Sequence, residues 1–151
     1  MGKIKQHIDK IAGQSVYIDT NLFIYFLDQN TEFFPISADI LEAVEQGKFF
    51  AFTGDLTVAE ALVKPYQLNN LSLISTFKAF FFADNFLSIA SHNADTFDLS
   101  SQIRAKYKMK FADALHYATA IKSGCQFFIT NDKGIRSTDD MEVILIKDLL
   151  K

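Results

Sequence analysis

The chain has 151 residues and a formal net charge of −3, with 49% hydrophobic and 22% charged residues. That length is ordinary for one domain and is enough for a hydrophobic core without disulfides or a structural metal. The single cysteine, Cys125, excludes an internal disulfide and a cysteine-based zinc site, and the acidic balance excludes a uniformly basic nucleic-acid-binding surface.

The first half of the chain alternates between helical and strand patterns. The stretch Ile36–Gln46 repeats apolar residues at helical spacing, and Gly47 is a natural end for that helix. Asp55 or Thr57 is the expected cap of the helix that follows. In chain order we expect an amphipathic helix at Met1–Ile11, a strand at Val16–Asp19, helices at Asn21–Leu27 and Ile36–Gln46, a strand at Phe49–Thr53, and a helix that carries Glu60 and breaks near Pro65.

The second half continues the same alternation. Gly124 is a natural helix end, and Cys125 directly precedes an apolar run, so we expect it to be a buried and inert thiol. In chain order we expect a helix at Leu71–Phe82, a strand at Phe86–Ala90, helices at Asp95–Tyr107 and Phe111–Ser123, and strands at Gln126–Thr130 and Val143–Ile146.

Strands separated by helices predict parallel pairing with right-handed crossovers. The expected fold class is therefore α/β, a three-layer sandwich with a mostly parallel central sheet flanked by helices. In such sheets, ligands bind beyond the carboxyl ends of the strands. We expect one domain over residues 1–151, with residues 1–14 as an N-terminal helical extension.

Four acidic residues, Asp19, Glu60, Asp113 and Asp132, are placed so that they can meet at this edge of the sheet. Asp19 and Asp132 follow apolar strands, whereas Glu60 and Asp113 lie on predicted helices. Each acid also has a simpler explanation. Asp19 can cap a helix, Glu60 can be exposed, Asp113 can favour a helix dipole, and Asp132 can belong to a turn.

The four acids are harder to explain as a set. Two carboxylates about 4 Å apart repel by roughly 4 kcal/mol at an effective dielectric constant near 20. A cluster of four requires that some are protonated or that a cation neutralises them. Hard oxygen donors without cysteine ligands favour Mg²⁺ or Mn²⁺ over zinc or copper.

These residues occur in four ordered motifs that resemble the PIN-domain ribonucleases, and among them the VapC-type toxins of prokaryotic toxin–antitoxin pairs. The resemblance runs from about Ser15 to the C-terminus. The motifs are the apolar strand with Asp19-Thr20-Asn21, the pair Thr57 and Glu60, the run from Asp113 to Ala120, and Ile129-Thr130-Asn131-Asp132-Lys133.

The resemblance implies a PIN-like fold, a Mg²⁺ or Mn²⁺ site, and endonucleolytic hydrolysis of RNA that leaves a 3′-hydroxyl and a 5′-phosphate. It assigns the metal and the catalysis to Asp19, Glu60, Asp113 and Asp132, with Glu60 as a ligand or a base. It also implies supporting roles for Asn21, Thr57 and Asn131, and an antitoxin protein as partner.

A basic stretch ending in Lys108 and Lys110 precedes Asp113, and Lys133 follows Asp132. We interpret these three lysines as candidate RNA-phosphate contacts; the alternative is a solvated helix end, where cations suit the dipole. His116 lies three residues after Asp113 on the same helix face. It can ligate a metal or act as a base, but its apolar surroundings favour a hydrogen-bonded structural histidine.

Two other functions fit parts of the pattern. An aspartyl phosphotransferase would use Asp19 as nucleophile, but it usually needs a second aspartate two residues later, where this chain has Asn21. A non-catalytic PIN-fold binding module usually lacks one of the acids, and none is missing. The scattered glycines exclude a phosphate-binding loop. We expect a cytoplasmic protein, because no apolar run approaches the ~20 residues of a membrane span and the N-terminus lacks a signal peptide's apolar core.

Sixteen phenylalanines exceed what one small core readily takes up, and Phe33-Phe34 and Phe80-Phe81-Phe82 are contiguous. A helix cannot bury three consecutive residues on one face, so at least one of Phe80, Phe81 and Phe82 should point away from the core. We therefore expect a homodimer whose surface includes helical phenylalanines. The alternative is a monomer that buries all of them under the N-terminal extension.

Overall fold

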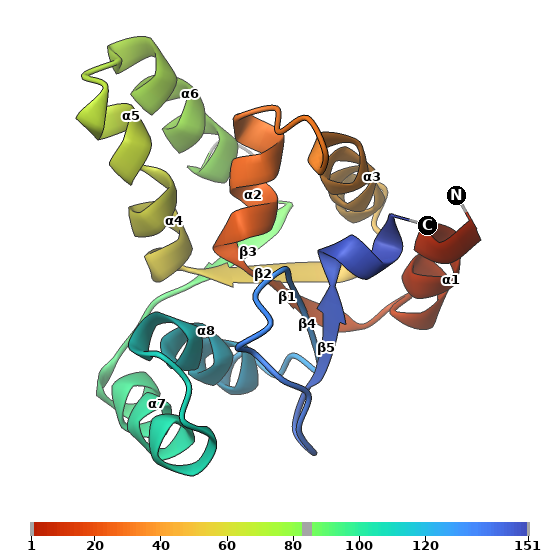
Figure 1. The fold of residues 1–151 in the computed structure, drawn as a ribbon, viewed down its shortest axis with the longest axis vertical. Coiled ribbons are helices and arrows are strands. Elements are labelled where there is room, and N and C mark those ends of the chain that lie inside the picture. Colours follow the sequence, from red (N-terminus) through yellow and green to blue (C-terminus); the bar gives the residue numbers. More distant parts are fainter. Residues whose placement is uncertain (1, 83–85, 151) are drawn as a thin grey trace.

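The computed structural model describes residues 2–82 and 86–150; Met1, the first residue of the predicted N-terminal helix, lies outside them. A five-stranded sheet in the order β3-β2-β1-β4-β5 forms the centre, and every strand pair is parallel (Figure 1). The expected α/β architecture is confirmed, with a fully rather than mostly parallel sheet. The strands are β1 Ser15–Ile18, β2 Phe50–Gly54, β3 Leu87–Ala90, β4 Phe127–Thr130 and β5 Glu142–Leu145.

The predicted helices lie close to where the sequence places them, with ends that differ by one or two residues, whereas α5 and η1 are not predicted. They are α1 Gly2–Lys10, α2 Thr20–Leu27, α3 Phe34–Glu45, α4 Asp55–Ala61, α5 Val63–Gln67, α6 Leu71–Phe82, α7 Ala94–Tyr107, α8 Phe111–Lys122 and the final 3₁₀ turn η1 Ile146–Leu149. None of the described helices is long and apolar enough to cross a membrane.

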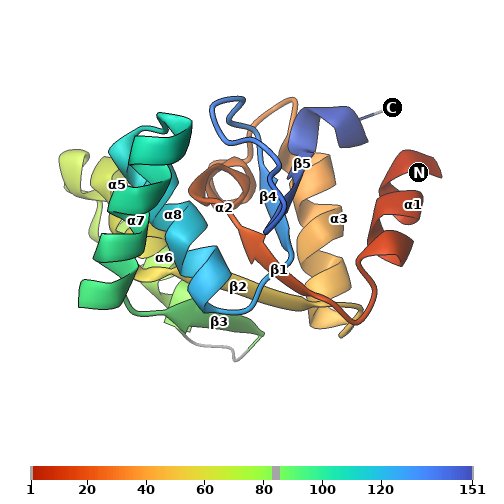
Figure 2. The same ribbon diagram turned by 90° about the horizontal axis from the view of Figure 1, so that it is seen from below.

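Alternation along the strands divides the core between the two faces of the sheet. Val16 and Ile18 point into a core shared with α1–α4 and α6, whereas Tyr17 and Phe128 point into a second core beneath α7 and α8. Figure 2 shows α7 and α8 on one side of the sheet and α1 and α3 on the other. This arrangement leaves the carboxyl ends of β1 and β4 between the two helical layers.

The start of α4 differs from the prediction. Neither Asp55 nor Thr57 caps the helix; Gly54 is the N-cap, and the backbone N–H of Leu56 donates instead to the ring of His92 at 3.1 Å. The break near Pro65 also falls earlier, at Leu62. Pro65 lies in the first turn of α5, where a missing N–H costs no helical hydrogen bond.

The N-terminal helix α1 buries Ile4 and Ile8, with Ile11 just beyond its end, and packs against α3 and η1. Lys10 forms an ion pair with Glu142 at the start of β5. These contacts tie the segment before the first strand to the edge of the sheet.

More of the phenylalanines are buried or stacked within the fold than their large number leads one to expect. Phe33 stacks on Tyr25 with ring centroids 4.7 Å apart, and Phe34 stacks on Phe26 at 5.4 Å. Phe81 is buried but Phe82 is 61% exposed, which confirms that the three consecutive residues cannot share one buried face. The exposed phenylalanines among the described residues are Phe50, Phe82, Phe97 and Phe111.

Candidate active site

Asp19 lies at the point where the order of the sheet reverses direction. Chain connections lead from β1 through β2 to β3 on one side, and β4 then pairs with the other side of β1. Ile18 pairs with Ile129, so Asp19 and Thr130 emerge together at the carboxyl ends of neighbouring strands. Such a reversal is the usual ligand-binding position in an open parallel sheet.

Both oxygens of the Asp19 carboxylate accept hydrogen bonds. The backbone N–H of Thr20 donates to Oδ1 at 2.8 Å, and the hydroxyl of Thr130 donates to Oδ2 at 2.6 Å. Asp19 therefore does cap α2, as its position after the strand allows. Its side chain is almost completely buried, and burial raises the pKa of this carboxyl despite the two donors and the nearby charge of His116.

Asp113 and Asp132 form an acidic pair. Asp113 is in the first turn of α8, and Asp132 is in the loop after β4. Burial, followed by contact with Asp132 and by the charges of Asp132 and Asp19, raises the pKa of Asp113 to about 7. The two carboxylates are therefore strained against each other when both are ionised.

Gly134 makes room for this pair. A Cβ atom at Gly134 would lie 3.1 Å from Oδ1 of Asp132 and 3.5 Å from Oδ2 of Asp113. The backbone N–H of Gly134 also donates to Oδ1 of Asp132 at 2.8 Å, which fixes that carboxylate in the loop. A side chain at Gly134 would therefore crowd the Asp132 carboxylate.

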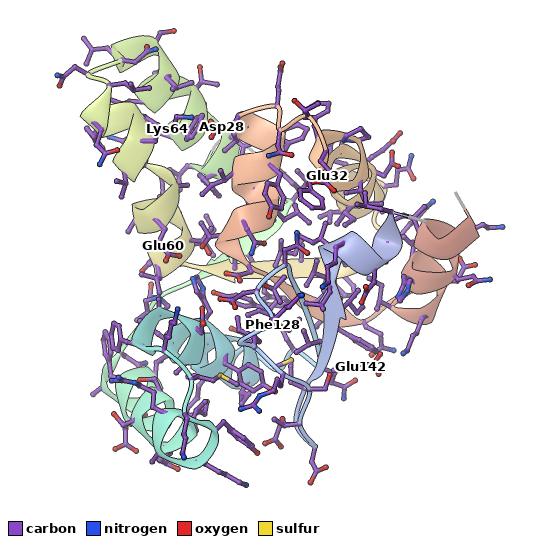
Figure 3. All side chains as sticks on the ribbon, viewed as in Figure 1. Asp28, Glu32, Glu60, Lys64, Phe128 and Glu142 are labelled. Carbon is purple, nitrogen blue, oxygen red and sulfur yellow. The ribbon has the colours of Figure 1, made fainter. Side chains whose placement is uncertain are left out.

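Glu60 reaches the same region from α4 (labelled in Figure 3). Its Oε1 lies 2.7 Å from Nε2 of His116 and accepts a hydrogen bond from the hydroxyl of Thr20 at 2.6 Å. Burial opposes the charge on Glu60, but the hydrogen bonds from His116 and Thr20 outweigh it and lower its pKa. Glu60 is therefore an ionised, partnered side chain and not a simply exposed one.

His116 connects the acids and is the residue that sequence reasoning undervalued. It is buried and hydrogen-bonded, as a structural histidine would be, but its partners include Glu60, and Oδ1 of Asp19 lies 3.6 Å from its Nε2. Its other ring nitrogen, Nδ1, is 2.7 Å from the hydroxyl of Tyr17. Burial disfavours its charge, yet Glu60 and Asp19 together raise the pKa of His116 above its ordinary value.

The three predicted supporting residues contribute differently. Thr57 accepts from Thr53 at 2.6 Å and lies 3.3 Å from the hydroxyl of Thr20, so it supports the Glu60 side of the site. Asn21 donates to Thr130 at 3.3 Å, and its Oδ1 is buried without a hydrogen-bond partner among the described residues. Within the part of the chain that the structure describes, the side chain of Asn131 makes no hydrogen bond to any of the four acids.

Asn131 instead holds the loop after β4. Its amide donates to the hydroxyl of Tyr25 at 3.2 Å, and its Oδ1 accepts from the backbone N–H of Lys147 at 3.0 Å. The loop that carries Asp132 is thereby attached both to α2 and to the start of η1.

The predicted basic residues are exposed around this edge. Lys108 ends α7 in the left-handed conformation (φ 58°), and Lys110 is the N-cap of α8. Lys133 follows Asp132 and contacts Lys147, which the sequence did not indicate; this contact with a second ammonium group lowers the pKa of Lys147. Two cations therefore stand side by side near the Asp132 loop.

The donor chemistry of the site fits a hard divalent cation. Asp113 and Asp132 repel each other, and the buried Oδ1 of Asn21 is an unused oxygen donor. As the side chains stand, however, no three His, Cys, Asp or Glu residues in the described ranges are close enough together to hold a metal ion. Two of the four acids are instead drawn toward His116.

Residues 16–141 match the PIN domain family. No curated protein matches the chain. Among solved structures, the chain is similar to a toxin–antitoxin complex from Klebsiella pneumoniae, with 20% identity and a TM-score of 0.64 over 87% of this chain and 97% of that one.

Two other structures have comparable folds. VapBC2 from Rickettsia felis, bound to a promoter DNA fragment, is 14% identical with a TM-score of 0.68 over 87% of this chain and 98% of that one. VapC20 from Mycobacterium tuberculosis, a toxin that cleaves the sarcin–ricin loop, is 13% identical with a TM-score of 0.60 over 75% of this chain and 86% of that one. At these identities the similarity establishes the shared fold.

Proposed function

Since this chain belongs to the PIN domain family, we propose that it is a Mg²⁺- or Mn²⁺-dependent endoribonuclease. The observation that carries the proposal is the pairing of Asp113 with Asp132 beside Asp19, which raises the pKa of Asp113 to about 7. Three carboxylates that repel one another at the ligand-binding edge of a parallel sheet are stabilised when they share a divalent cation.

Asp19, Asp113 and Asp132 would hold the metal, with Glu60 as a further ligand or as a base. A bound Mg²⁺ or Mn²⁺ supplies electrophilic stabilisation of the phosphate and a more acidic water. Thr20 and Thr130 orient the Asp19 carboxylate through their hydrogen bonds. His116 favours the ionised form of Glu60, because its Nε2 lies 2.7 Å from Oε1 of Glu60 and this hydrogen bond lowers the pKa of the carboxyl.

A general base needs a pKa high enough to take a proton from water. The pairing with His116 lowers the pKa of Glu60 and makes it a weak base. This favours Glu60 as a ligand or an orienting group over Glu60 as the principal base. Lys108, Lys110 and Lys133 would contact the RNA phosphates, and Lys147 joins them through its contact with Lys133.

Two structures of similar fold are described as a toxin–antitoxin complex and as VapBC2. By extension we propose that this chain is the toxin of such a pair, that an antitoxin protein binds it, and that it acts on cytoplasmic RNA as a homodimer. A phosphotransferase mechanism through Asp19 is disfavoured, because the second aspartate that such enzymes usually need two residues later is Asn21 in this chain.

The test is cleavage of single-stranded and structured RNA by the purified chain, with Mg²⁺ or Mn²⁺ and with excess EDTA. We expect cleavage with either cation, products bearing a 5′-phosphate, and no cleavage in EDTA. Undiminished cleavage in EDTA would contradict the metal requirement, and tight RNA binding without cleavage under any metal would favour a non-catalytic binding module.

A further inference from the structure

His92 lies in the segment between β3 and α7, outside the acidic site, and makes hydrogen bonds through both ring nitrogens. The backbone N–H of Leu56, in the first turn of α4, donates to Nε2 at 3.1 Å. The hydroxyl of Thr119, on α8, lies 3.0 Å from Nδ1. One ring therefore connects the two helices that carry Glu60 and His116.

Only one assignment of donors and acceptors is consistent with this series of hydrogen bonds. A backbone N–H can only donate, so Nε2 of His92 must be unprotonated. The proton of the neutral ring is then on Nδ1 and is donated to the Thr119 hydroxyl. Thr119 in turn donates its own proton to the backbone carbonyl of Leu115 at 2.7 Å.

Both ends of this series of hydrogen bonds are adjacent to the acidic site. Leu56 is one helical turn before Glu60, on the same face of α4, and Leu115 directly precedes His116 on α8. Gly54, the N-cap of α4, leaves space for the ring: a Cβ there would lie 2.9 Å from Cε1 of His92 and 2.9 Å from the hydroxyl of Tyr17. The same tyrosine hydroxyl contacts His116.

We propose that His92 is a positioning residue whose neutral ring holds α4 against α8, so that Glu60 and His116 stay paired, and whose protonation releases this contact. A protonated Nε2 would point an N–H at the N–H of Leu56, which removes the acceptor that replaces a side-chain cap on α4. The consequence for the site is that the Glu60 and His116 side chains are no longer held at hydrogen-bonding distance.

The charged groups around His92 favour the neutral ring at neutral pH. Burial lowers its pKa below the ordinary 6.5, Asp55 on α4 acts in the opposite direction, and the charge of His116 on α8 lowers it further. The contact from α7 is the apolar ring of Phe97, with centroids 6.2 Å apart, and Asp95 and Lys122 line a small polar pocket together with Thr119. Release is therefore expected only below pH 6.5.

The test compares the wild-type chain with two variants at His92 and one matched control. His92→Gln keeps an acceptor for Leu56 but cannot titrate, whereas His92→Phe keeps a ring and loses both hydrogen bonds. His7→Gln removes a histidine from α1, outside both the acidic site and the His92 contacts. RNA cleavage and thermal unfolding are measured from pH 5 to 8, and the His92 ring nitrogens and the Leu56 amide are followed by NMR.

We expect the His92→Phe variant to lose roughly 10- to 100-fold in kcat at every pH with little change in KM, because its acids are misplaced. His92→Gln should retain most of the activity at pH 7.5 and lose less of it on the acid side than wild type and His7→Gln. The NMR data should place the proton of the neutral ring on Nδ1 and move the Leu56 amide signal with a midpoint below pH 6.5.

An acid-side loss in His92→Gln equal to that of wild type would overturn the proposal, as would a neutral ring protonated on Nε2. The activity arm rests on the proposed nuclease function, but the NMR arm does not. A wild-type chain that cleaves no RNA would therefore refute the nuclease while leaving the tautomer and the Leu56 titration to decide the role of His92.

Discussion

Glu60 of α4 and His116 of α8 are joined by a contact of 2.7 Å between Oε1 and Nε2, although they are 56 residues apart in the sequence. The pair lies against Asp19, whose Oδ1 is 3.6 Å from the same ring nitrogen. When it is protonated, His116 brings the only positive charge that the described hydrogen bonds and ion pairs place against the four acids.

This pairing predicts a pH-dependent contribution to stability. The pKa of His116 is raised in the folded chain, so the contribution is complete below about pH 6.5 and is lost as the pH rises through the raised value. A double-mutant cycle of Glu60→Gln and His116→Gln should give a coupling of about 1 kcal/mol at pH 6, because Glu60 is partly exposed and screened. A coupling that grows between pH 6 and 9 would contradict the assignment.

The Asp113–Asp132 pair predicts the behaviour of the metal-free chain. Because the pKa of Asp113 is raised from 3.8 to about 7, the folded state binds more protons than the unfolded state between these values, and stability falls as the pH rises through them. Asp132→Asn should remove part of that fall and raise the Tm at pH 8 more than at pH 5.

The measurement is thermal unfolding in EDTA and in Mg²⁺ or Mn²⁺ at both pH values. A cation should raise the Tm of the wild-type chain chiefly at pH 8, where both carboxylates are ionised, and should raise that of Asp132→Asn much less. Equal stabilisation of both proteins would show that Asp132 does not bind the metal.

How much of this site the sequence predicts depends on what determines each residue's place. Asp19 and Asp132 are found because they follow apolar runs, and strand ends in a parallel sheet share one edge. The contact of Glu60 with His116 is not predictable in that way, because it depends on how α4 and α8 are rotated and packed. His92 has no sequence context at all; only the folded chain brings it to Leu56 and Thr119.

The same distinction holds for the fold. Alternation along the strands predicts which residues face which helical layer, since Val16 and Tyr17 must point to opposite sides. The prediction that Asp55 or Thr57 caps α4 is wrong, because the acceptor for the backbone N–H of Leu56 is His92, 36 residues later in the chain. The sequence overstates how many phenylalanines are left for the surface, because stacked pairs such as Tyr25 with Phe33 fill space between helices.

Asp19→Asn should lose activity without losing the fold. The substitution removes one metal-binding charge at the centre of the site, and we expect a decrease in kcat of roughly 100-fold or more. Burial already raises the pKa of Asp19, so the neutral amide should leave the metal-free chain at least as stable as wild type. RNA cleavage and unfolding in EDTA are measured together; full activity would refute the role of Asp19.

The lysines near the acids predict the salt dependence of RNA binding. Each phosphate contact on a single strand contributes about 0.7 to the slope of log K against log salt. Lys110→Ala and Lys133→Ala should each reduce that slope by about this amount. Lys122→Ala is the matched control, because it is exposed at the other end of α8, about 18 Å from Lys110 along the axis. An equal effect of Lys122→Ala would indicate general electrostatics and not a binding track.

Association is the remaining expectation, and the structure indicates where to test it. Val63, Tyr66, Leu68 and Leu71 are 51–81% exposed around the end of the α5–α6 hairpin, which projects from the body of the chain (Figure 1). Phe82, 61% exposed, lies at the other end of α6. A stable interface buries about 800 Å² on each partner, more than these side chains alone supply, so it would have to include the helix faces between them.

Light scattering at micromolar concentration should give twice the chain mass of 17.1 kDa for wild type. Leu71→Glu and Phe82→Glu should shift that value toward one chain mass with an unchanged Tm of the monomeric fold, because both side chains are already in water. Leu150→Glu, at an exposed apolar position beyond η1, is the control and should stay dimeric. A wild-type mass of one chain at the same concentration would refute the homodimer.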